Sequence, residues 1–340
     1  MNRTEEKYTK YALCREMLES VGVAKGFDPS RTKGLAEAFG RIGRVLLTGE
    51  GSSRIFPAKN LIRKILTAGL DVQVVTEGSR QAATYDLSKF VVCAASNSGR
   101  TKEVVKLLQQ LKEKGHENLF GLTAKEDNLL KDYTNETLVL TCGWENAVAA
   151  TKSVLEQAMV YQSTAAHLAG VEIPQKAMEP FAAALDKALT MDIPADVVQA
   201  ACNAGTIHFA GYNDGVAEEL TLKTNEITRK KSDFLEGTYA VHGIEEVMDP
   251  GDIVFVVEPI AEEMQKFHDV LVKGVGMKVV CIATRAVEGF PTIQVPDVCM
   301  MNPFLFLAAG WNLLVEIGLS LGIDLDKPTR ARKVGNEFVG

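Results

Sequence analysis

The stretch FVVCAASNSGRTKEVVKLLQQLKEK (residues 90–114) decides the fold of this chain. Its first six residues are apolar, which is typical of a strand buried on both faces of a parallel sheet. From Lys102 onward apolar residues recur at helical spacing, so a helix is expected over 102–114. Between them lies the polar turn 96–101. A strand, a tight turn and a helix in this order form the repeating unit of open α/β sheets.

The polar turn, SNSGRT, has the composition of a phosphate-binding loop. Backbone N–H groups at the start of a helix have no partner inside it and point toward an incoming anion. Three residues of the turn, Ser96, Ser98 and Thr101, add hydroxyl groups, and Gly99 permits close approach of the backbone. An ordinary helix cap needs one such hydroxyl. Three in one turn favour an anion site over a simple cap.

Strands and helices alternate on both sides of this unit. Further strands are expected at 44–48, 71–75, 118–123 and 136–140, and further helices at 56–68 and 145–168. This alternation predicts an α/β fold with a doubly wound parallel sheet, covered by helices on both faces. The strand at 44–48 ends at Gly49-Glu50-Gly51-Ser52-Ser53, so a second pair of hydroxyls is expected at the same sheet edge as the polar turn.

The second half of the chain repeats this plan. The strand ending at Gly211 corresponds to the one ending at Gly49, and Ile253 corresponds to Val91; both pairs are 162 residues apart (211 − 49 and 253 − 91). A duplicated domain is therefore expected. The counterpart of the polar turn, 257–259, has no hydroxyl, so the second copy should keep the fold without the phosphate site. We divide the chain into an N-terminal helical segment (1–40), a phosphate-binding domain (41–170), a second domain (181–323) and a C-terminal tail (324–340).

Composition limits the class of protein. The 340 residues are 46% hydrophobic and 24% charged, with a net charge of −7, which indicates a globular chain of about two domains. Mild acidity without a basic stripe argues against nucleic acid as a partner. The apolar run 304–323 is interrupted by Asn312 and Glu316, which favours a buried core helix over a membrane span.

Cysteine usage and the N-terminus indicate a cytoplasmic location. The first residues lack the apolar segment of a signal peptide. The cysteines show no CxxC spacing, so reduced thiols fit better than a disulfide framework or a zinc site. They stand at positions 14, 93, 142, 202, 281 and 299.

A helix in the second half carries a regular row of charged side chains. Glu219, Lys223 and Glu226 fall at i, i+4 and i+7, on one face. Spacing alone favours a surface face with ion pairs. The helix follows the first strand of the repeat, however, so it starts at the ligand-binding edge of its sheet. Sixteen residues after Glu226 comes His242, in GTYAVHG, where an isolated histidine would ordinarily be a packed or loop residue.

These motifs together resemble the sugar isomerase (SIS) domain family, and specifically the tandem arrangement in the isomerase half of glucosamine-6-phosphate synthase. The likeness covers roughly residues 40–335. It implies that the sugar phosphate is bound by Ser52, Ser53, Ser96, Asn97, Ser98 and Thr101, with Asn97 in place of the usual Gln. The segment AVAATK (147–152) resembles the family's Val-Ala-Ser-Thr-Lys and implies sugar contacts by Val148 and Ala150, where Ala150 replaces the Ser.

The same resemblance implies roles for the charged residues. Glu226 is then the general base that moves a proton between C1 and C2, and His242 assists ring opening from the neighbouring subunit of a homodimer with shared active sites. Lys223 and Glu219 position and polarise the site, with Lys223 holding Glu226 ionised. The tail DLDKPTRARK resembles the family's Asp-x-Pro tail, in which the lysine at the position of Lys333 can form a Schiff base with the open-chain ketose.

No cofactor is expected. Gly49-Glu50-Gly51 lacks the third glycine of a dinucleotide-binding fingerprint, which argues against NAD. The five histidines do not cluster with carboxylates at metal-ligand spacing, so no metal site is expected. Only about 40 residues precede the likeness and no cysteine stands before Cys14, so a glutamine-dependent synthase is not expected.

We therefore expect a phosphosugar isomerase, either deaminating or a simple aldose–ketose isomerase, acting on a hexose or amino-hexose 6-phosphate, with neither nucleic acid nor membrane as a partner. One alternative is a deglycase of a phosphorylated sugar–amine adduct. In that case Arg54 and Arg80 would meet a second anionic group, although surface solvation is their simpler role. An alternative of another class is a non-catalytic phosphosugar-binding regulator, which would need the polar turn but not Glu226 and His242.

Overall fold

The computed structural model describes residues 1–332 and 337–338 of the chain. It divides into two compact units, neither of which is contiguous in sequence. The first-sheet unit comprises residues 22–145 and 150–179 with the described part of 332–340. The second-sheet unit comprises residues 1–21, 146–149 and 180–331.

The first-sheet unit is built on a parallel sheet with the strand order β2-β1-β3-β4-β5. The strands are β1 (Arg44–Gly49), β2 (Gln73–Gly78), β3 (Val91–Ala95), β4 (Leu119–Thr123) and β5 (Glu136–Val139). Its helices are α3 (Lys33–Ile42), α4 (Ile55–Thr67), α5 (Ser79–Ala82), α6 (Lys102–Glu113) and α7 (Lys152–Leu168). The predicted alternation of strands and helices is confirmed.

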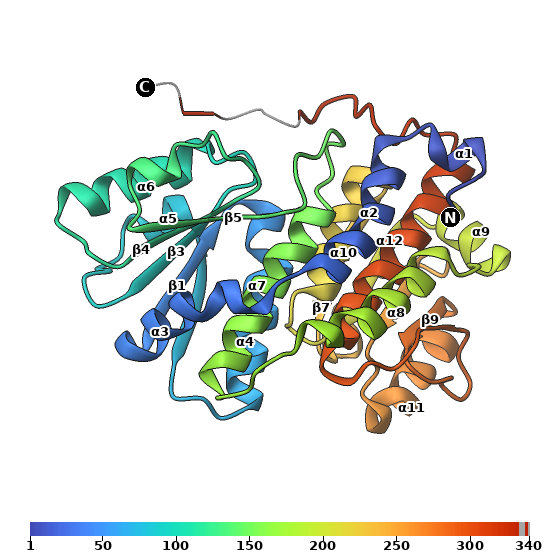
Figure 1. The fold of residues 1–340 in the computed structure, drawn as a ribbon. Coiled ribbons are helices and arrows are strands. Elements are labelled where there is room, and N and C mark those ends of the chain that lie inside the picture. The colour runs from blue at the N-terminus through green and yellow to red at the C-terminus, as the bar shows by residue number, and fades with distance from the viewer. Residues whose placement is uncertain (333–336, 339–340) are drawn as a thin grey trace. The chain divides into compact units, whose positions relative to one another are not determined.

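Helices cover both faces of this sheet (Figure 1). On one face, Val105 and Leu108 of α6 pack onto Leu46 and Val92 in a fully buried apolar cluster. On the other face, α7 packs against both α3 and α4. Every residue of β3 is buried, because a central parallel strand is covered on both sides, and this explains its unbroken run of small apolar residues.

The second-sheet unit has the same strand order, β7-β6-β8-β9-β10, again parallel. The strands are β6 (Thr206–Gly211), β7 (Lys231–Glu236), β8 (Ile253–Val257), β9 (Lys278–Ala283) and β10 (Thr292–Gln294). Helices α9 (Ala195–Asn203), α10 (Val216–Lys223) and α12 (Asn302–Ser320) pack together, and α11 (Met264–Phe267) joins a separate apolar cluster. The remaining helices of the chain are α1 (Glu6–Thr9), α2 (Ala12–Gly26) and α8 (Met178–Thr190).

Each sheet has a glycine at the same point of closest approach. A Cβ atom on Gly49 would lie 2.9 Å from the carbonyl oxygen of Ala95, and one on Gly211 would lie 2.9 Å from that of Val257. The ends of β1 and β3, and likewise of β6 and β8, therefore meet too closely for any side chain. The crevice at the carboxyl ends of the strands, where open α/β sheets bind ligands, has the same backbone plan in both units.

The predicted helix over 145–168 begins later than expected. Helix α7 starts at Lys152, and residues 145–151 form an irregular turn. The buried carboxylate of Glu145 accepts hydrogen bonds from the backbone N–H of Thr151 at 2.6 Å and from the hydroxyl of Ser153. These bonds hold the backbone in a conformation that an α-helix would exclude.

Helix α12 is a core helix, as predicted for residues 304–323. It is long and apolar enough to cross a membrane, but 83% of its most apolar window is buried inside the structure. Trp311, Phe304 and Leu305 are fully buried in it.

Candidate functional site

The serine-rich loop after β3 forms a compact hydrogen-bonded turn. The Oγ atoms of Ser96 and Thr101 lie 2.8 Å apart, and the N–H of Thr101 donates to Ser96 Oγ at 3.4 Å. The N–H of Arg100 donates to Ser98 Oγ at 3.2 Å. Helix α6 begins at the next residue, Lys102, so the N–H groups of its first turn have no acceptor within the helix. Hydroxyls and helix-start N–H groups thus gather at one place, the arrangement that binds phosphate.

Gly99 is required by the shape of this loop. Its φ is +65°, in the left-handed region, and a Cβ atom there would lie 2.3 Å from Cβ of Asn128 and 3.0 Å from Oγ1 of Thr123. Its carbonyl accepts the N–H of Leu129 at 3.0 Å. The loop therefore closes directly onto the segment after β4.

The second serine pair lies at the same edge of the sheet. Ser52 and Ser53 form a short 3₁₀ turn, 51–53, directly after β1, and β1 is the parallel neighbour of β3. The side-chain amide of Gln157 on α7 donates to the carbonyl of Ser53 and fixes the turn. The structure thus brings all six predicted phosphate-binding residues to one sheet edge. Their contact with a phosphate stays a prediction.

Glu145 supports the loop and was missed by sequence reasoning. Its side chain is fully buried, and one carboxylate oxygen accepts the side-chain N–H of Asn97 at 3.2 Å. An amide N–H of Asn97 is therefore used inside the protein. The sequence ENAVAAT (145–151) contains no glycine or proline, so helical propensity concealed the turn that Glu145 holds. The one available signal was a glutamate in an otherwise small, apolar segment.

The end of the chain pairs with the loop in the first-sheet unit. Glu337 forms an antiparallel bridge with Thr101, and the N–H of Phe338 donates to the carbonyl of Arg100 at 2.9 Å. Phe338 also packs against the apolar cluster under the loop. The predicted tail residue Lys333 lies outside the described residues.

The charged row on α10 is an inward-facing ion-pair set. Nζ of Lys223 lies 3.4 Å from Oε1 of Glu219 and 2.7 Å from Oε2 of Glu226. The side chains of Glu219 and Lys223 are buried, whereas that of Glu226 is 26% exposed. The surface ion-pair face that spacing alone favours is therefore not what the structure shows. Glu226 is the member of the three that a substrate can reach.

Glu226 lies in a π-helical turn. Helix α10 ends at Lys223, and residues Thr224–Thr228 follow with π-helical hydrogen bonding, closed by Arg229 at a φ of +57°. π-Turns are rare and occur frequently at functional sites, because the extra residue redirects one side chain. Here the turn places Glu226 at the edge of the ion-pair set while its two partners stay buried.

His242 is exposed and stands apart from the ion-pair set. It follows the 3₁₀ turn Tyr239–Val241, and its Nε2 lies 3.3 Å from Nζ of Lys266. Since an ammonium group only donates, Nε2 of His242 is the acceptor in this contact. Among the described residues, no hydrogen bond or ion pair joins His242 to Glu226.

The predicted sugar-contact segment is an extended turn between β5 and α7. The carboxylate of Glu16 accepts the backbone N–H groups of Asn146 and Ala147. Val148 and Ala150 are half-buried. Their contact with a sugar stays a prediction.

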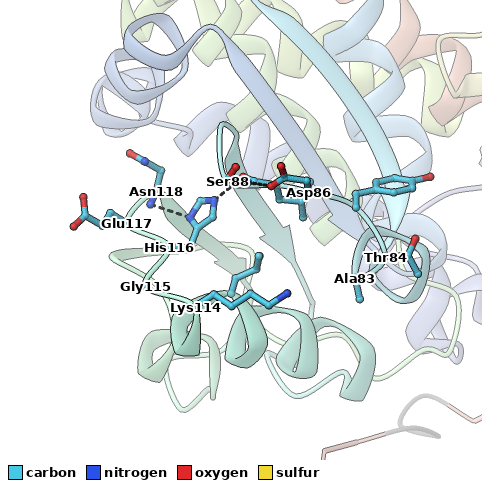
Figure 2. Close-up of a pocket in the computed structure, with 12 residues that line it drawn as sticks. Ala83, Thr84, Asp86, Ser88, Lys114, Gly115, His116, Glu117 and Asn118 are labelled. Atoms are coloured by element: carbon cyan, nitrogen blue, oxygen red, sulfur yellow. Dashed lines mark hydrogen bonds between the residues drawn. The ribbon is translucent and has the colours of Figure 1, made fainter.

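A cavity of about 530 Å³ in the first-sheet unit belongs to neither site (Figure 2). It is lined by residues 83–88, which precede β3, and by residues 114–118, which precede β4, so it lies at the amino edge of the sheet. His116 accepts the N–H of Asn118 at Nδ1, 3.2 Å, and its Nε2 lies 2.9 Å from the carbonyl oxygen of Leu87. Both ring nitrogens are therefore engaged in structural contacts.

The predicted phosphate and catalytic residues belong to different units. The two serine loops are in the first-sheet unit, and the ion-pair set and His242 are in the second-sheet unit. In the described part of the chain, no group of three His, Cys, Asp or Glu side chains is placed to hold a metal ion.

Residues 41–167 match the SIS domain family. Two curated relatives are the glutamine–fructose-6-phosphate aminotransferases (isomerizing) of Methanococcus maripaludis, 23% identical over 96% of this chain and 57% of the relative, and of Aeropyrum pernix, 24% identical over 86% and 51%. The chain thus spans about half the length of the curated relatives it matches.

Solved structures share the fold of the whole described chain. The C-terminal domain of the Francisella tularensis glucosamine-fructose-6-phosphate aminotransferase has a TM-score of 0.77 at 16% identity, covering 96% of this chain and 100% of that one. The tagatose-6-phosphate ketose/aldose isomerase of Escherichia coli has a TM-score of 0.76 at 17% identity, with coverages of 96% and 98%. The glucosamine-6-phosphate deaminase of Thermotoga maritima has a TM-score of 0.70 at 20% identity, with coverages of 94% and 98%.

Proposed function

We propose that this chain, which carries a SIS domain over residues 41–167, is a phosphosugar isomerase acting on a hexose or amino-hexose 6-phosphate. The observation that carries the proposal is the hydroxyl-rich loop at the start of α6, within that domain. A phosphate on C6 anchors the sugar there, and the same protein then needs a base to move a proton between C1 and C2. Glu226 is our candidate for that base.

The ion-pair set supports this role for Glu226. Its Oε2 accepts a charge-assisted hydrogen bond from Nζ of the buried Lys223 at 2.7 Å, which orients the carboxylate for proton transfer. Lys223 and Glu219 are buried, so they position Glu226 instead of touching substrate. If the sugar carries an amino group, the same proton transfer yields an imine that water hydrolyses, with loss of ammonia. Deamination and simple isomerisation therefore share this machinery.

We further propose that the protein is a homodimer with shared active sites, in which His242 assists ring opening in the partner's site. The support is the exposed position of His242 and its separation in the chain from the ion-pair set. The proposal also divides the chain into two SIS-type domains, at 41–170 and 181–323. It includes Lys333 in the tail as the candidate for a Schiff base with the open-chain sugar. All six cysteines are free thiols, which agrees with a cytoplasmic location.

One observation favours a second candidate, a deglycase of a phosphorylated sugar–amino-acid adduct. A cavity of about 390 Å³ beside the serine loops is lined by Glu50, Arg80, Lys102, Glu103 and Lys106. Its mixed charges suit the carboxylate and ammonium groups of an amino acid. The predicted residue Arg80 lines it, whereas Arg54 does not.

The test is a substrate panel with the purified full chain. Fructose 6-phosphate, tagatose 6-phosphate, glucosamine 6-phosphate and 6-phosphofructosyl-glycine are each incubated with the protein, and ketose/aldose ratio, ammonia and released amine are measured. Turnover of a sugar phosphate or amino-sugar phosphate is expected. Turnover of the glycine adduct alone would select the deglycase. Saturable binding without turnover would select the non-catalytic regulator. The absence of both binding and turnover would overturn the assignment.

A further inference from the structure

The second sheet has a cavity of its own at the edge where ligands bind. Its volume is about 600 Å³, and its lining comes from residues that follow three parallel strands: Tyr212 after β6, Glu258 after β8, and Thr284 with Arg285 after β9. The connection that leaves β6 runs to β7 on one side, and the connection that leaves the adjacent β8 runs to β9 on the other. The cavity therefore occupies the topological switch point of this sheet, the general ligand position in open α/β folds.

This cavity is the counterpart of the phosphate loop, with opposite chemistry. Glu258 is the first residue after β8, as Ser96 is the first residue after β3, and the two are 162 residues apart (258 − 96). Pro259 follows and has no N–H to donate. The next helical segments are the short turn Ala261–Glu263, the four-residue α11 and the π-helical stretch His268–Val275, in place of the single twelve-residue α6. The turn at 258–259 therefore supplies no hydroxyl and one N–H fewer than the serine loop, and the side-chain donors of the lining are Tyr212, Thr284 and Arg285.

The charges of the lining select a cation. Glu258, Glu288 and Asp297 contribute carboxylates, against the single guanidinium of Arg285. The side-chain amide of Asn302 and the N–H of Cys299 donate to Oδ1 of Asp297 at 3.0 and 2.9 Å, and these bonds lower its pKa and keep it ionised. A concave surface of one dominant sign concentrates ligands of the other sign.

The rest of the lining provides a floor for a small organic body. Met264 and Phe306 are buried apolar residues of the cavity wall, and Tyr212 contributes a phenol group. Binding pockets combine such an apolar wall with a few polar groups that fix orientation.

The backbone holds Glu258 in a costly conformation. Its φ is +50°, in the left-handed region that favours glycine, and its N–H donates to the carbonyl of Ile282 at 3.0 Å. A non-glycine residue there is disfavoured relative to glycine, because its Cβ crowds the backbone. Such positions persist at ligand sites, where the surroundings determine the residue.

We propose that this cavity binds a small metabolite bearing a primary ammonium group, either an amino sugar without phosphate or an amino acid. The site is separate from the phosphate loop, and it goes beyond the proposed isomerase reaction.

The experiment is calorimetric titration of the full chain in excess inorganic phosphate, which occupies the phosphate loop. The probes are D-glucosamine, its neutral isostere N-acetyl-D-glucosamine, glycine and L-lysine. We expect saturable binding of glucosamine or of an amino acid, and the probe that binds identifies the source of the ammonium group. N-acetyl-D-glucosamine should bind at least about tenfold more weakly than D-glucosamine, since the ammonium charge is absent.

Matched variants locate the site. Glu258→Gln removes one lining charge and should weaken binding at least about tenfold, whereas Glu262→Gln, an exposed neighbour outside the lining, should leave it unchanged. If Glu258→Gln fails to fold, Glu288→Gln replaces it. The proposal is overturned if no ammonium probe binds the wild-type chain, if the acetylated sugar binds equally well, or if removal of a lining carboxylate has no effect.

Discussion

The two sheets of this protein share one strand order and differ at one edge. After β3, the chain turns through serines and a glycine into the twelve-residue α6; after β8, it turns through Glu258 and Pro259 into short helical pieces. Both turns rest on the same close approach of a glycine to a carbonyl oxygen, 2.9 Å from a would-be Cβ. The backbone plan of the crevice is therefore common to both, and the two crevices differ in the residues at positions 96–101 and 258–263, which we propose set the ligand of each.

The largest expected effect comes from the charged set that only the second-sheet unit carries. Glu226→Gln keeps the size of the side chain and removes the base, so kcat for the substrate found by the panel should fall about 10²–10⁴-fold. KM should change little, since phosphate binding rests on the other sheet. Glu262→Gln is the control. Wild-type turnover by the Glu226 variant would show that the ion-pair set has a structural role only.

A mixing experiment tests whether two subunits of a dimer share their active sites. Glu226→Gln and His242→Asn chains, each inactive alone, are combined in equal amounts after unfolding and refolding together. If active sites are shared, half of the dimers are mixed and each has one intact site, so about a quarter of wild-type activity should return. Measured activity that stays at the level of the separate variants would contradict a shared site.

Gly99 tests how strictly the phosphate loop is built. Gly99→Ala places a Cβ atom 2.3 Å from Asn128, whereas Gly115→Ala, at a similarly positive φ, meets nothing within 4 Å. Gly115→Ala should cost about 1–2 kcal/mol from backbone strain alone. Gly99→Ala should cost a further 1–3 kcal/mol, roughly, from overpacking and raise KM about tenfold.

Urea unfolding and steady-state kinetics measure the two quantities for Gly99→Ala and Gly115→Ala. Equal unfolding free energies and equal KM values for the two alanine variants would mean that the loop can relax around Asn128.

The smallest expected effect concerns the strand interior. His208 in β6 stands where β1 has Leu46, and its burial lowers its pKa despite Asp252, whose carboxylate lies 3.7 Å away. The unfolded chain therefore binds a proton at His208 more readily than the folded chain does. As a result, the free energy of unfolding is highest above about pH 6.5 and falls as the pH drops below that value. His208→Leu should flatten the dependence of unfolding free energy on pH between pH 7.5 and 5. An unchanged slope would assign the acid sensitivity to other groups.

Sequence patterns predicted the sheet of each unit because buried parallel strands leave near-continuous apolar runs such as Val91–Ala95. They also predicted an anion-binding loop at 96–101. An ordinary helix cap needs one hydroxyl, whereas Ser96, Ser98 and Thr101 supply three. They placed the start of α7 wrongly, since the hydrogen bonds of Glu145 outweigh the helical propensity of its neighbours. The burial of Glu219 and Lys223 could not be predicted from their spacing either. Spacing shows which residues share a helix face, but not what packs against that face.

The π-turn around Glu226 and the cavity beside Glu258 were not predicted. A π-turn shifts the hydrogen-bond register by one residue, and no residue type marks that shift. The absence of hydroxyls at 257–259 predicts that no phosphate binds at the second edge. It does not indicate whether a ligand of other chemistry binds there.

The interleaving of the two units has a consequence for how the chain is made. The first backbone N–H groups of α2, at Ala12 and Leu13, are capped by the carboxylate of Asp326, more than 300 residues later. At roughly 5–20 residues per second, the ribosome leaves this helix end without its acceptor for about 15–60 s. The second-sheet unit therefore acquires its full set of contacts only after residue 326 has been made, and its high contact order slows folding. We expect the nascent chain to depend on chaperone protection during that interval more than a sequentially folded pair of domains would.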